Sequence, residues 1–367
     1  MEARRPPGAD GGSARVVLDV RPGADLGGPA GVGHAPNGSL TRLLDVASTP
    51  AVLVGGAGFI GRHLAHALVD RGHERVILCD ISAPRWSMSE EMEYLQRDVR
   101  RPVQIGGLGG ARPLVFNLAA VHRTPGHEDR EYHETNEQGA HEVVAFCERH
   151  DVEDLWFTSS IAVYGPTEAP VTEASPLRPQ SAYGRSKLAA ETIHEEWARG
   201  RPGRRLVTVR PGTVFGPGEG GNFTRLAWAL KRRRFVYPGR RDTIKACGYV
   251  GDLVESLFFM HRHAEPAVTY NFSYDPPPTI EQVCEAFQEV GNLPAPLGTV
   301  PLGPILAVAR VLHAAGFEAF RPERVRKLDR STNIQPRRLA EAGFPYATSL
   351  RTGLAAWRDA TPAGEFV

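Results

Sequence analysis

The chain contains 367 residues, 43 of them basic and 42 acidic, so its formal net charge of +1 does not favour nucleic acid or an anionic membrane as a partner. Hydrophobic residues make up 41% of the chain and charged residues 23%, the composition of an ordinary globular protein long enough for two domains. No signal peptide is visible, and no apolar run reaches the ~18 residues of a membrane span. The four cysteines lie far apart without C-x-x-C spacing, so we expect reduced thiols in a cytoplasmic protein, with no metal site and no membrane partner.

Residues 1–48 are rich in glycine and proline and offer little apolar surface to offset the entropy of ordering, so we expect a disordered arm. Further along, short apolar runs alternate with helical stretches. The runs are AVLVG, RVILCD, PLVFNLAA, DLWFTSS and RLVTVRPG. Strands of this kind are buried on both faces, which predicts an α/β fold with a doubly wound parallel sheet over residues 50–215 and a return to the sheet near residues 243–263. The irregular segment 216–360 predicts a smaller C-terminal lobe that binds substrate.

The first predicted strand runs directly into a glycine-rich turn that opens a helix. Gly55, Gly58 and Gly61 stand at G-x-x-G-x-x-G spacing in AVLVGGAGFIGRHLAHAL. A tight strand-to-helix turn requires glycine where a Cβ would clash, and the N–H groups at the start of the helix then face a diphosphate. A glycine-rich loop without a ligand is the alternative, but the strand and helix that the motif requires are both present. We therefore expect a dinucleotide here, with Phe59 and Ile60 also in contact with it.

Acidic residues end the next two predicted strands. Asp80 ends RVILCD, nineteen residues after Gly61, where a carboxylate accepts hydrogen bonds from both adenosine ribose hydroxyls. Such a carboxylate repels a 2′-phosphate, so NAD is favoured over NADP, although Arg85 lies only a few residues further on. Asp98 follows another predicted strand, and contact with the adenine amino group is one interpretation while an ordinary surface carboxylate is the other.

Ten motifs in order make the chain resemble the extended short-chain dehydrogenase/reductase family, most closely its nucleotide-sugar epimerase/dehydratase branch. They are GGAGFIG, Asp80, RDV, NLAA, ETNEQGA, FTSSIAVYG, YGRSK, RPGTVFGPG, YVGDLVES and LAEAGFPYATSLRTGLAAW. The resemblance implies a Rossmann-type sheet, NAD as cofactor and a nucleotide diphosphate sugar as substrate. It also implies a homodimer paired through the helices predicted at residues 136–150 and 181–199.

The resemblance also assigns further cofactor contacts and a catalytic set. The added cofactor-binding residues are Val99, Leu118, Ala119, Ala120, Asn136 and Pro211, together with Tyr183 and Lys187. The catalytic residues are Ser160, Tyr183 and Lys187. By themselves, Tyr183 and Lys187 are also compatible with an ordinary surface pair on an amphipathic helix.

The chemistry of hydride transfer supports this set independently. A carbinol that loses hydride to NAD must also lose its hydroxyl proton, and a tyrosinate takes that proton only if the tyrosine pKa of ~10 is lowered. Lys187 lies one helical turn after Tyr183 and therefore on the same face, where its charge stabilises the phenolate and its ammonium reaches the nicotinamide ribose. Ser160 would hydrogen-bond the reacting oxygen, with its neighbour Ser159 as the second candidate.

The residues after Ser160 restrict the reaction. Relatives that eliminate water carry acidic residues there, whereas this chain has Ile161 and Ala162, which transfer no protons. The sequence therefore predicts either transient oxidation with re-reduction, which is 4-epimerisation, or net oxidation or reduction of one hydroxyl group.

Substrate contacts are predicted at positions that match the sugar branch only in part. They are Ser159, His122, Thr213, Asn222, Phe223, Lys245 and Arg324. Thr213 replaces an asparagine of many relatives, and Lys245 replaces a diphosphate-binding arginine and loses its bidentate fork. Asn222 as a helix cap, and Lys245 and Arg324 as surface charges, are the alternatives.

Two other functions remain open at this point. A hydroxysteroid or other lipid-alcohol dehydrogenase would use the apolar segment 301–317 as a pocket wall or a membrane-facing helix. A non-catalytic NAD-binding scaffold is the third hypothesis, but a scaffold does not require Ser160, Tyr183 and Lys187 together.

Overall fold

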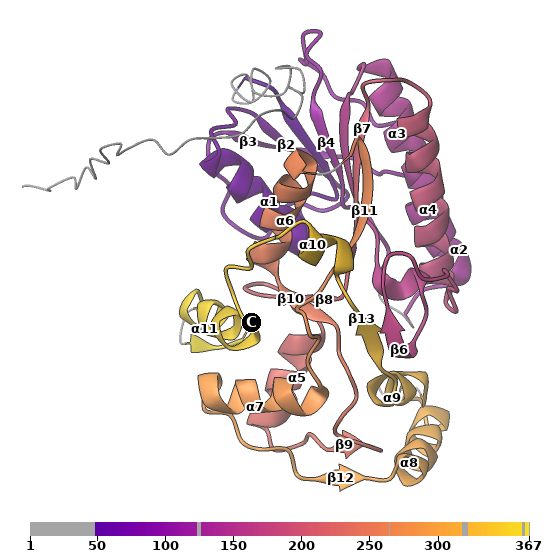
Figure 1. Ribbon diagram of the computed structural model, residues 1–367, viewed down its shortest axis with the longest axis vertical. Coiled ribbons are helices and arrows are strands. Elements are labelled where there is room, and N and C mark those ends of the chain that lie inside the picture. Colours follow the sequence, from indigo (N-terminus) through magenta and orange to yellow (C-terminus); the bar gives the residue numbers. More distant parts are fainter. Residues whose placement is uncertain (1–47, 123–125, 264, 318–321, 362–363, 367) are drawn as a thin grey trace, which may run out of the picture. The chain divides into compact units, whose positions relative to one another are not determined.

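Seven parallel strands form the central sheet of the protein, which a computed structural model describes at residues 48–122, 126–263, 265–317, 322–361 and 364–366 (Figure 1). All these residues belong to one unit, Leu43–Val367. The strand order is β11-β7-β5-β4-β1-β2-β3. The strands are β1 (Ala51–Val54), β2 (Val76–Asp80), β3 (Met92–Gln96), β4 (Leu114–Asn117), β5 (Asp154–Thr158), β7 (Arg205–Pro211) and β11 (Ala267–Phe272). Because every pairing is parallel, all carboxyl ends lie at one edge of the sheet.

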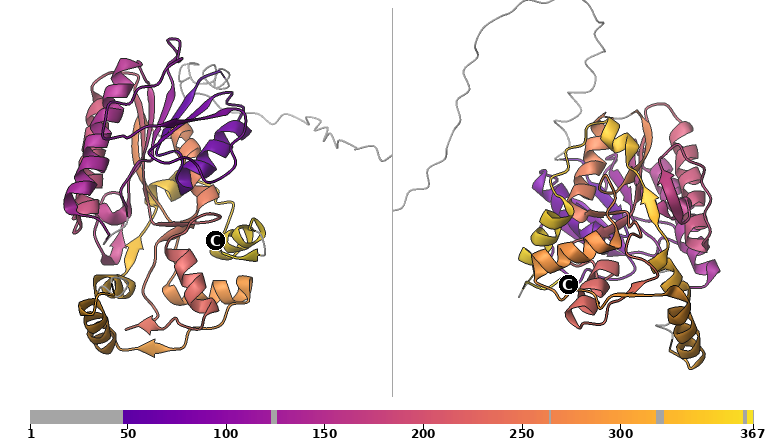
Figure 2. Two further views of the ribbon diagram at one scale, coloured as in Figure 1. Left: turned by 180° about the vertical axis from the view of Figure 1, so that it is seen from behind. Right: turned by 60° about the horizontal axis from the view of Figure 1, so that its bottom comes forward.

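Helices cover both faces of this sheet, and the residues of β1 explain why. All four are buried, and they alternate between two cores. Ala51 and Leu53 pack in the core beneath α1 (Phe59–Asp70) and α6 (Val250–His263). The other two residues of β1 pack against α3 (Gly139–Arg149) and α4 (Ala182–Arg199). Figure 2 shows the two helix pairs on opposite sides of the sheet.

Helix α4 carries the predicted catalytic pair, and its start is defined by a side-chain cap. The Ser181 hydroxyl accepts a hydrogen bond from the Gly184 N–H at 3.1 Å. Before α3, the chain forms the short helix α2 (Asp129–Tyr132) and a π-helical stretch (His133–Gln138) that packs against α4.

A second group of elements has its own core, formed by α5 (Asn222–Lys231), α7 (Ile280–Gly291) and α11 (Leu350–Asp359). Three small parallel strand pairs connect this region, and the remaining helices follow them. The pairs are β8 (Thr213–Phe215) with β10 (Cys247–Tyr249), β9 (Tyr237–Pro238) with β12 (Thr299–Val300), and β6 (Thr167–Val171) with β13 (Thr332–Ile334). The helices are α8 (Leu302–Ala314), α9 (Pro322–Asp329) and α10 (Arg337–Glu341), and a 3-10 turn spans Ile161–Val163.

The predicted α/β fold, with a doubly wound parallel sheet and a smaller C-terminal group of helices, is confirmed. The chain returns to the sheet through α6 and β11, close to the predicted segment 243–263. The arm predicted for residues 1–48 lies outside the described residues except for its last one. In the described part of the chain, no helix combines the length and apolar character needed to cross a membrane.

Candidate active site

The glycine turn between β1 and α1 allows two stretches of backbone to approach closely. Gly55 has a positive φ of 82°, and a Cβ on it would lie 2.6 Å from the amide nitrogen of Ala119, just after β4. A Cβ on Gly61 would lie 2.4 Å from the Gly56 carbonyl oxygen. Gly58 precedes α1 without any side-chain cap, so the first N–H groups of the helix are left for an anion. This cradle fits the diphosphate of a dinucleotide.

The predicted cofactor contacts follow the carboxyl edge of the sheet. Asp80, the last residue of β2, accepts hydrogen bonds at 3.2 Å from the backbone N–H groups of Ala57 in the glycine turn and of Ser82. The remaining predicted contacts at this edge lie at the start of α1, after β4 and at the end of β7. They are Phe59 and Ile60, then Leu118, Ala119 and Ala120, and finally Pro211.

Other predicted cofactor residues already have protein partners. The Asp98 carboxylate pairs with Arg100 at 2.7 Å, and this hydrogen bond lowers the pKa of Asp98. Val99 is buried where Gly139 of α3 approaches it. Asn136 is also buried, and its amide oxygen accepts from the Val121 N–H while its amide nitrogen donates to the Val121 carbonyl and to Ser186 of α4. Asn136 therefore ties the segment after β4 to α4.

The structure brings Ser160, Tyr183 and Lys187 together at the end of β5. Ser160 is the second residue after β5, and its hydroxyl forms a hydrogen bond with half-buried Tyr183. Lys187 is 2% exposed, and its ammonium donates to the Thr158 carbonyl at 2.8 Å and lies 4.8 Å from the centre of the Phe157 ring. The hydrogen bond from Lys187 to Thr158 thus joins α4 to the end of β5, two residues before Ser160.

Burial shifts the pKa values of Tyr183 and Lys187 so that the neutral form of each side chain is favoured. It raises the pKa of Tyr183, and the hydrogen bond with Ser160 offsets only part of this. It lowers the pKa of Lys187 to about 7, and the negative charge of Glu191 acts in the opposite direction. Hence the phenolate that the chemistry requires is not favoured in the protein by itself, and further positive charge is needed beside the Tyr183 oxygen.

Sequence reasoning missed two buried residues beside this set, Glu191 and Arg210. Arg210 of β7 forms a bidentate ion pair with Glu191 of α4, with its Nε 2.9 Å from Oε1 and its Nη2 2.6 Å from Oε2. The Ser159 hydroxyl donates to the same carboxylate. The sequence carried one signal for Glu191, its spacing: it stands four residues after Lys187 and therefore on the same face of the helix as Tyr183 and Lys187.

The predicted substrate residues are scattered. Ser159 is buried and bonded to Glu191, and Thr213 of β8 is half-buried. His122, which follows β4, is exposed. Asn222 is exposed as the first residue of α5 and accepts a hydrogen bond from Arg225.

The other predicted substrate residues are committed elsewhere, or lie outside the described set. The ring of Phe223 stacks on Phe215 at 4.6 Å in the core of the second group, which leaves only its backbone for a ligand. The Lys245 ammonium donates to the carbonyls of Lys327 and Arg330 at 3.0 and 2.8 Å, and burial lowers its pKa to about 8. The side chain of Arg324 is not among those that the structure describes.

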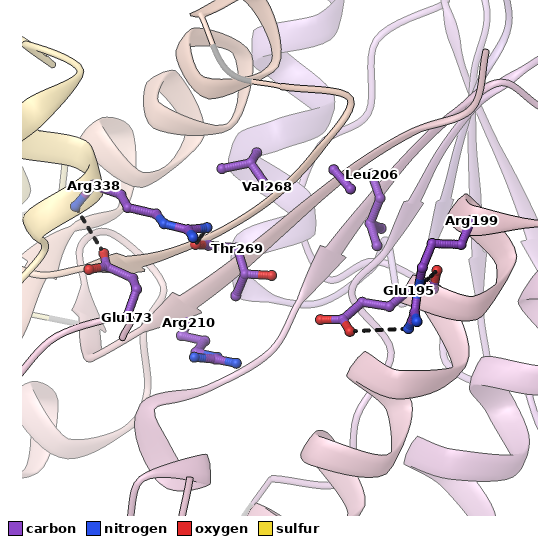
Figure 3. A pocket seen from close by; sticks show the side chains of 9 residues that line it. Glu173, Glu195, Arg199, Leu206, Arg210, Val268, Thr269 and Arg338 are labelled. Carbon is purple, nitrogen blue, oxygen red and sulfur yellow. Dashed lines mark hydrogen bonds and ion pairs between the residues drawn. The ribbon is translucent and has the colours of Figure 1, made fainter. Parts of the chain in front are cut away.

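Two hollows in the surface are lined by residues other than Ser160, Tyr183 and Lys187. A pocket of about 330 Å³ between α4, β7 and edge strand β11 is lined by charged and apolar side chains, Arg210 and Val268 among them (Figure 3). Another of about 280 Å³ is lined by Asp98, Arg100, Arg101, Glu134 and Gln138. Within the described residues, no group of three or more His, Cys, Asp or Glu side chains is placed to hold a metal ion.

A glycine cradle at the carboxyl edge of a doubly wound sheet, with a serine, a tyrosine and a lysine gathered beside it, defines a dinucleotide-dependent oxidoreductase of the short-chain type. Residues 51–272 match the model of the NAD dependent epimerase/dehydratase family, and the chain belongs to that family. The protein is therefore an NAD-dependent enzyme, as the sequence predicted. The glycine cradle and Asp80 would hold this cofactor.

Two of the similar proteins are named as 4-epimerases of sugars carried by a diphosphate. N-acetyl-alpha-D-glucosaminyl-diphospho-ditrans,octacis-undecaprenol 4-epimerase of Escherichia coli O157:H7 is 27% identical over 329 residues, which cover 86% of this chain and 95% of the relative. UDP-glucose 4-epimerase of Azospirillum brasilense is 29% identical over 287 residues, 68% of this chain and 80% of the relative. The solved structure of MoeE5 in complex with UDP-glucose and NAD has a TM-score of 0.65 at 23% identity, covering 84% of this chain and 97% of its own, and shares the fold.

Replacing Asp80 with alanine should weaken NAD binding about tenfold or more and narrow the preference for NAD over NADP. The reason is that hydrogen bonds to a charged group contribute about 1.5–3 kcal/mol, and the same carboxylate repels a 2′-phosphate. Calorimetric titration with both nucleotides measures this. Asp70→Ala, at the exposed end of α1, is the matched control and should bind like the wild type. An unchanged NAD/NADP ratio in Asp80→Ala would mean that Asp80 does not contact the ribose.

Proposed function

We propose that the enzyme transfers hydride to and from one hydroxyl-bearing carbon of a nucleotide diphosphate sugar, as a 4-epimerase or as a net dehydrogenase or reductase of a 4-keto sugar. The observation that carries this proposal is the hydrogen bond between Ser160 and Tyr183, with buried Lys187 one turn along the same helix. The family supports the cofactor, and the names of both curated relatives support a 4-epimerase. We further propose that the second group of helices, with most of residues 216–360, holds the substrate.

The side chains divide the proton chemistry in a simple way. NAD, when bound, would supply the hydride acceptor and an additional positive charge in the site. Ser160 holds the substrate hydroxyl by a hydrogen bond, and Tyr183 accepts the proton of that hydroxyl as the carbonyl forms. Lys187 stabilises the phenolate by its charge. In an epimerisation, Tyr183 returns the proton to the same oxygen after the hydride has been delivered to the opposite face of the carbon.

The turn after Ser160 supports hydride transfer rather than elimination of water. Ile161 and Ala162 form a 3-10 turn together with Val163, which is fully buried. None of the three side chains transfers protons, so this turn supplies no second acid or base for dehydration.

A lipid alcohol or a lipid-carried sugar is the second candidate, and helix α8 favours it. This helix exposes Val308 at 58% and Val311 at 69%, and Phe317 just beyond it is 57% exposed. Val308 and Val311 stand three residues apart and therefore share one face of the helix, and exposed apolar side chains on one face are typical of contact with a lipid or another protein. The Escherichia coli relative is named for a substrate whose diphosphate is attached to undecaprenol.

We also propose that the enzyme is a cytoplasmic homodimer. The four cysteines are buried and free, as in reducing compartments. Helices α3 and α4 pack side by side on one face of the sheet, with α4 extending over eighteen residues, and a second copy of this pair would complete a four-helix bundle.

Nucleotide sugars should stabilise the NAD-saturated protein against heat more than sterols do. Binding to the folded state alone adds about 2.7 kcal/mol at a ligand concentration one hundred times Kd, which raises the melting temperature by a few degrees. A thermal-shift series with UDP-glucose, UDP-N-acetylglucosamine, GDP-mannose, dTDP-glucose and a sterol, each with NAD, makes the comparison. Stabilisation by the sterol and by no nucleotide sugar would reverse the ranking of the two candidates.

Tyr183→Phe should keep NAD binding and lower turnover of the stabilising sugar about 10²–10⁴-fold, because this is the usual contribution of a general acid–base group. Turnover is measured by the appearance of the epimeric or oxidised sugar. Tyr270→Phe is a matched control: Tyr270 is fully buried on β11 and bonded to Ser256, away from the site. Near-normal turnover in Tyr183→Phe would remove the catalytic assignment.

Sedimentation velocity should give the mass of two chains. Ala189→Glu, on the face of α4 that also carries exposed Arg185 and Thr192, should shift the protein toward a single chain, since an interface between two copies would have to desolvate the new charge. A single-chain mass for the wild-type protein at tens of micromolar would contradict the proposed dimer.

A further inference from the structure

A chain of buried polar side chains connects four elements behind the proposed catalytic set. Glu191 of α4 and Arg210 of β7 are only 2% and 5% exposed. Arg210 also donates to the Tyr164 hydroxyl at 2.7 Å, and that hydroxyl donates to Asn271 of β11 at 2.9 Å. Such an ion pair is costly to desolvate, so its presence under the site calls for a role other than stability alone.

The pair anchors the segment that carries Ser160. The Ser159 N–H donates to the Val209 carbonyl of β7 at 2.8 Å, and the Ser159 hydroxyl donates to the Glu191 carboxylate. Ser159 is thereby held from two sides. The position of Ser160, its direct neighbour and the partner of Tyr183, follows from this attachment.

The pair also determines which charges Lys187 experiences. Along α4, Tyr183 and His194 are close to it, and burial lowers the pKa of His194 to about 3, so that this imidazole is neutral. From the 3-10 turn and from α2, burial keeps Tyr164 protonated, and Tyr132 packs against Tyr183 at 6.2 Å between ring centroids. From β5, Lys187 meets only the Phe157 ring and the Thr158 carbonyl.

Of this ion pair, Glu191 is the member that acts on Lys187. Hydrogen bonds and the charge of Glu191 outweigh the burial of Arg210 and raise its pKa, so the guanidinium stays charged. Glu191 lies one helical turn after Lys187 and opposes the lowering of the lysine pKa by burial. Removing the Glu191 charge would take away the charge that raises the pKa of buried Lys187, and it would also leave the Arg210 guanidinium without its ion pair.

We propose that Glu191, held by Arg210, is a positioning residue of the active site: it fixes the Ser159–Ser160 segment and supplies the negative charge that keeps Lys187 protonated beside Tyr183. Only one part of this proposal rests on the proposed function, namely that the protonated Lys187 acts in turnover. The charge relation is a property of the folded chain without substrate, and it is measured there.

The composition of the chain makes a direct measurement practical. Lysine occurs only at positions 187, 231, 245 and 327. Protein labelled with ¹³C at the lysine Cε therefore gives four signals, which single Lys→Arg variants assign. The shift of each signal against pH gives the pKa of each ammonium in the full chain, with Lys231, exposed and paired with Glu365, as the internal reference.

Two substitutions separate charge from position. Glu191→Gln keeps the shape and removes the charge, and it should lower the Lys187 midpoint from about 7 by about one unit or more, the usual effect of a close opposite charge. Glu191→Asp keeps the charge but shortens the reach to Ser159, and it should leave the midpoint near the wild-type value while lowering kcat more than KM. Asp252→Asn, which removes another buried carboxylate, should leave the Lys187 midpoint unchanged.

Either of two results would overturn the proposal. The first is a Lys187 midpoint in folded Glu191→Gln that matches the wild type. The second is an equal displacement in Glu191→Gln and Glu191→Asp, which would attribute the effect to lost packing. If Glu191→Gln alone fails to fold, Glu191→Gln with Arg210→Met removes both charges and should still lower the midpoint. Since no substrate is used in the titration, failure of the proposed reaction would leave these results intact, and only the kcat comparison would be lost.

Discussion

The site depends on the close approach of two backbones at the carboxyl edge of the sheet. The turn after β1 meets the chain after β4, and at Gly55 even one methyl group would lie 2.6 Å from the Ala119 nitrogen. This approach places the open start of α1 beside the end of β4, while β5 and β7 end further along the same edge. A dinucleotide bound at the turn would therefore extend along the strand ends toward the residues that follow β5.

The features predictable from sequence are those in which the partners are close along the chain. The glycine spacing and the four-residue interval from Tyr183 to Lys187 each define a local geometry, a turn or one face of a helix, whatever the rest of the fold does. Helix α4 has nearly the predicted bounds because Ser181 caps it. The alternation of buried strands with helices similarly gave the parallel sheet.

Features whose partners come from distant segments were not predictable. Lys245 has the charge expected of a diphosphate ligand, but its ammonium is bonded to carbonyls more than eighty residues away at the end of α9. Asn136 is predicted to contact the cofactor, and the sequence did not indicate that its amide is also bonded to Val121 and Ser186. In both cases the sequence indicated a polar side chain with a specific binding partner. Their partners depend on how strands and helices pack, which one sequence does not reveal.

The charge on Lys187 follows from a conflict between two requirements of the same helix face. Lys187 must be buried to reach the Thr158 carbonyl and the surroundings of Tyr183, but burial removes the water that favours an ammonium. A carboxylate in direct contact with Lys187 would keep the lysine protonated, but it would also cancel the positive charge that Tyr183 experiences. Glu191 lies one helical turn away and is itself bound by Arg210. At this distance its charge favours the protonated form of Lys187 without cancelling the positive charge of Lys187 at Tyr183. The ion pair under α4 therefore resolves a conflict that Tyr183 and Lys187 create by themselves.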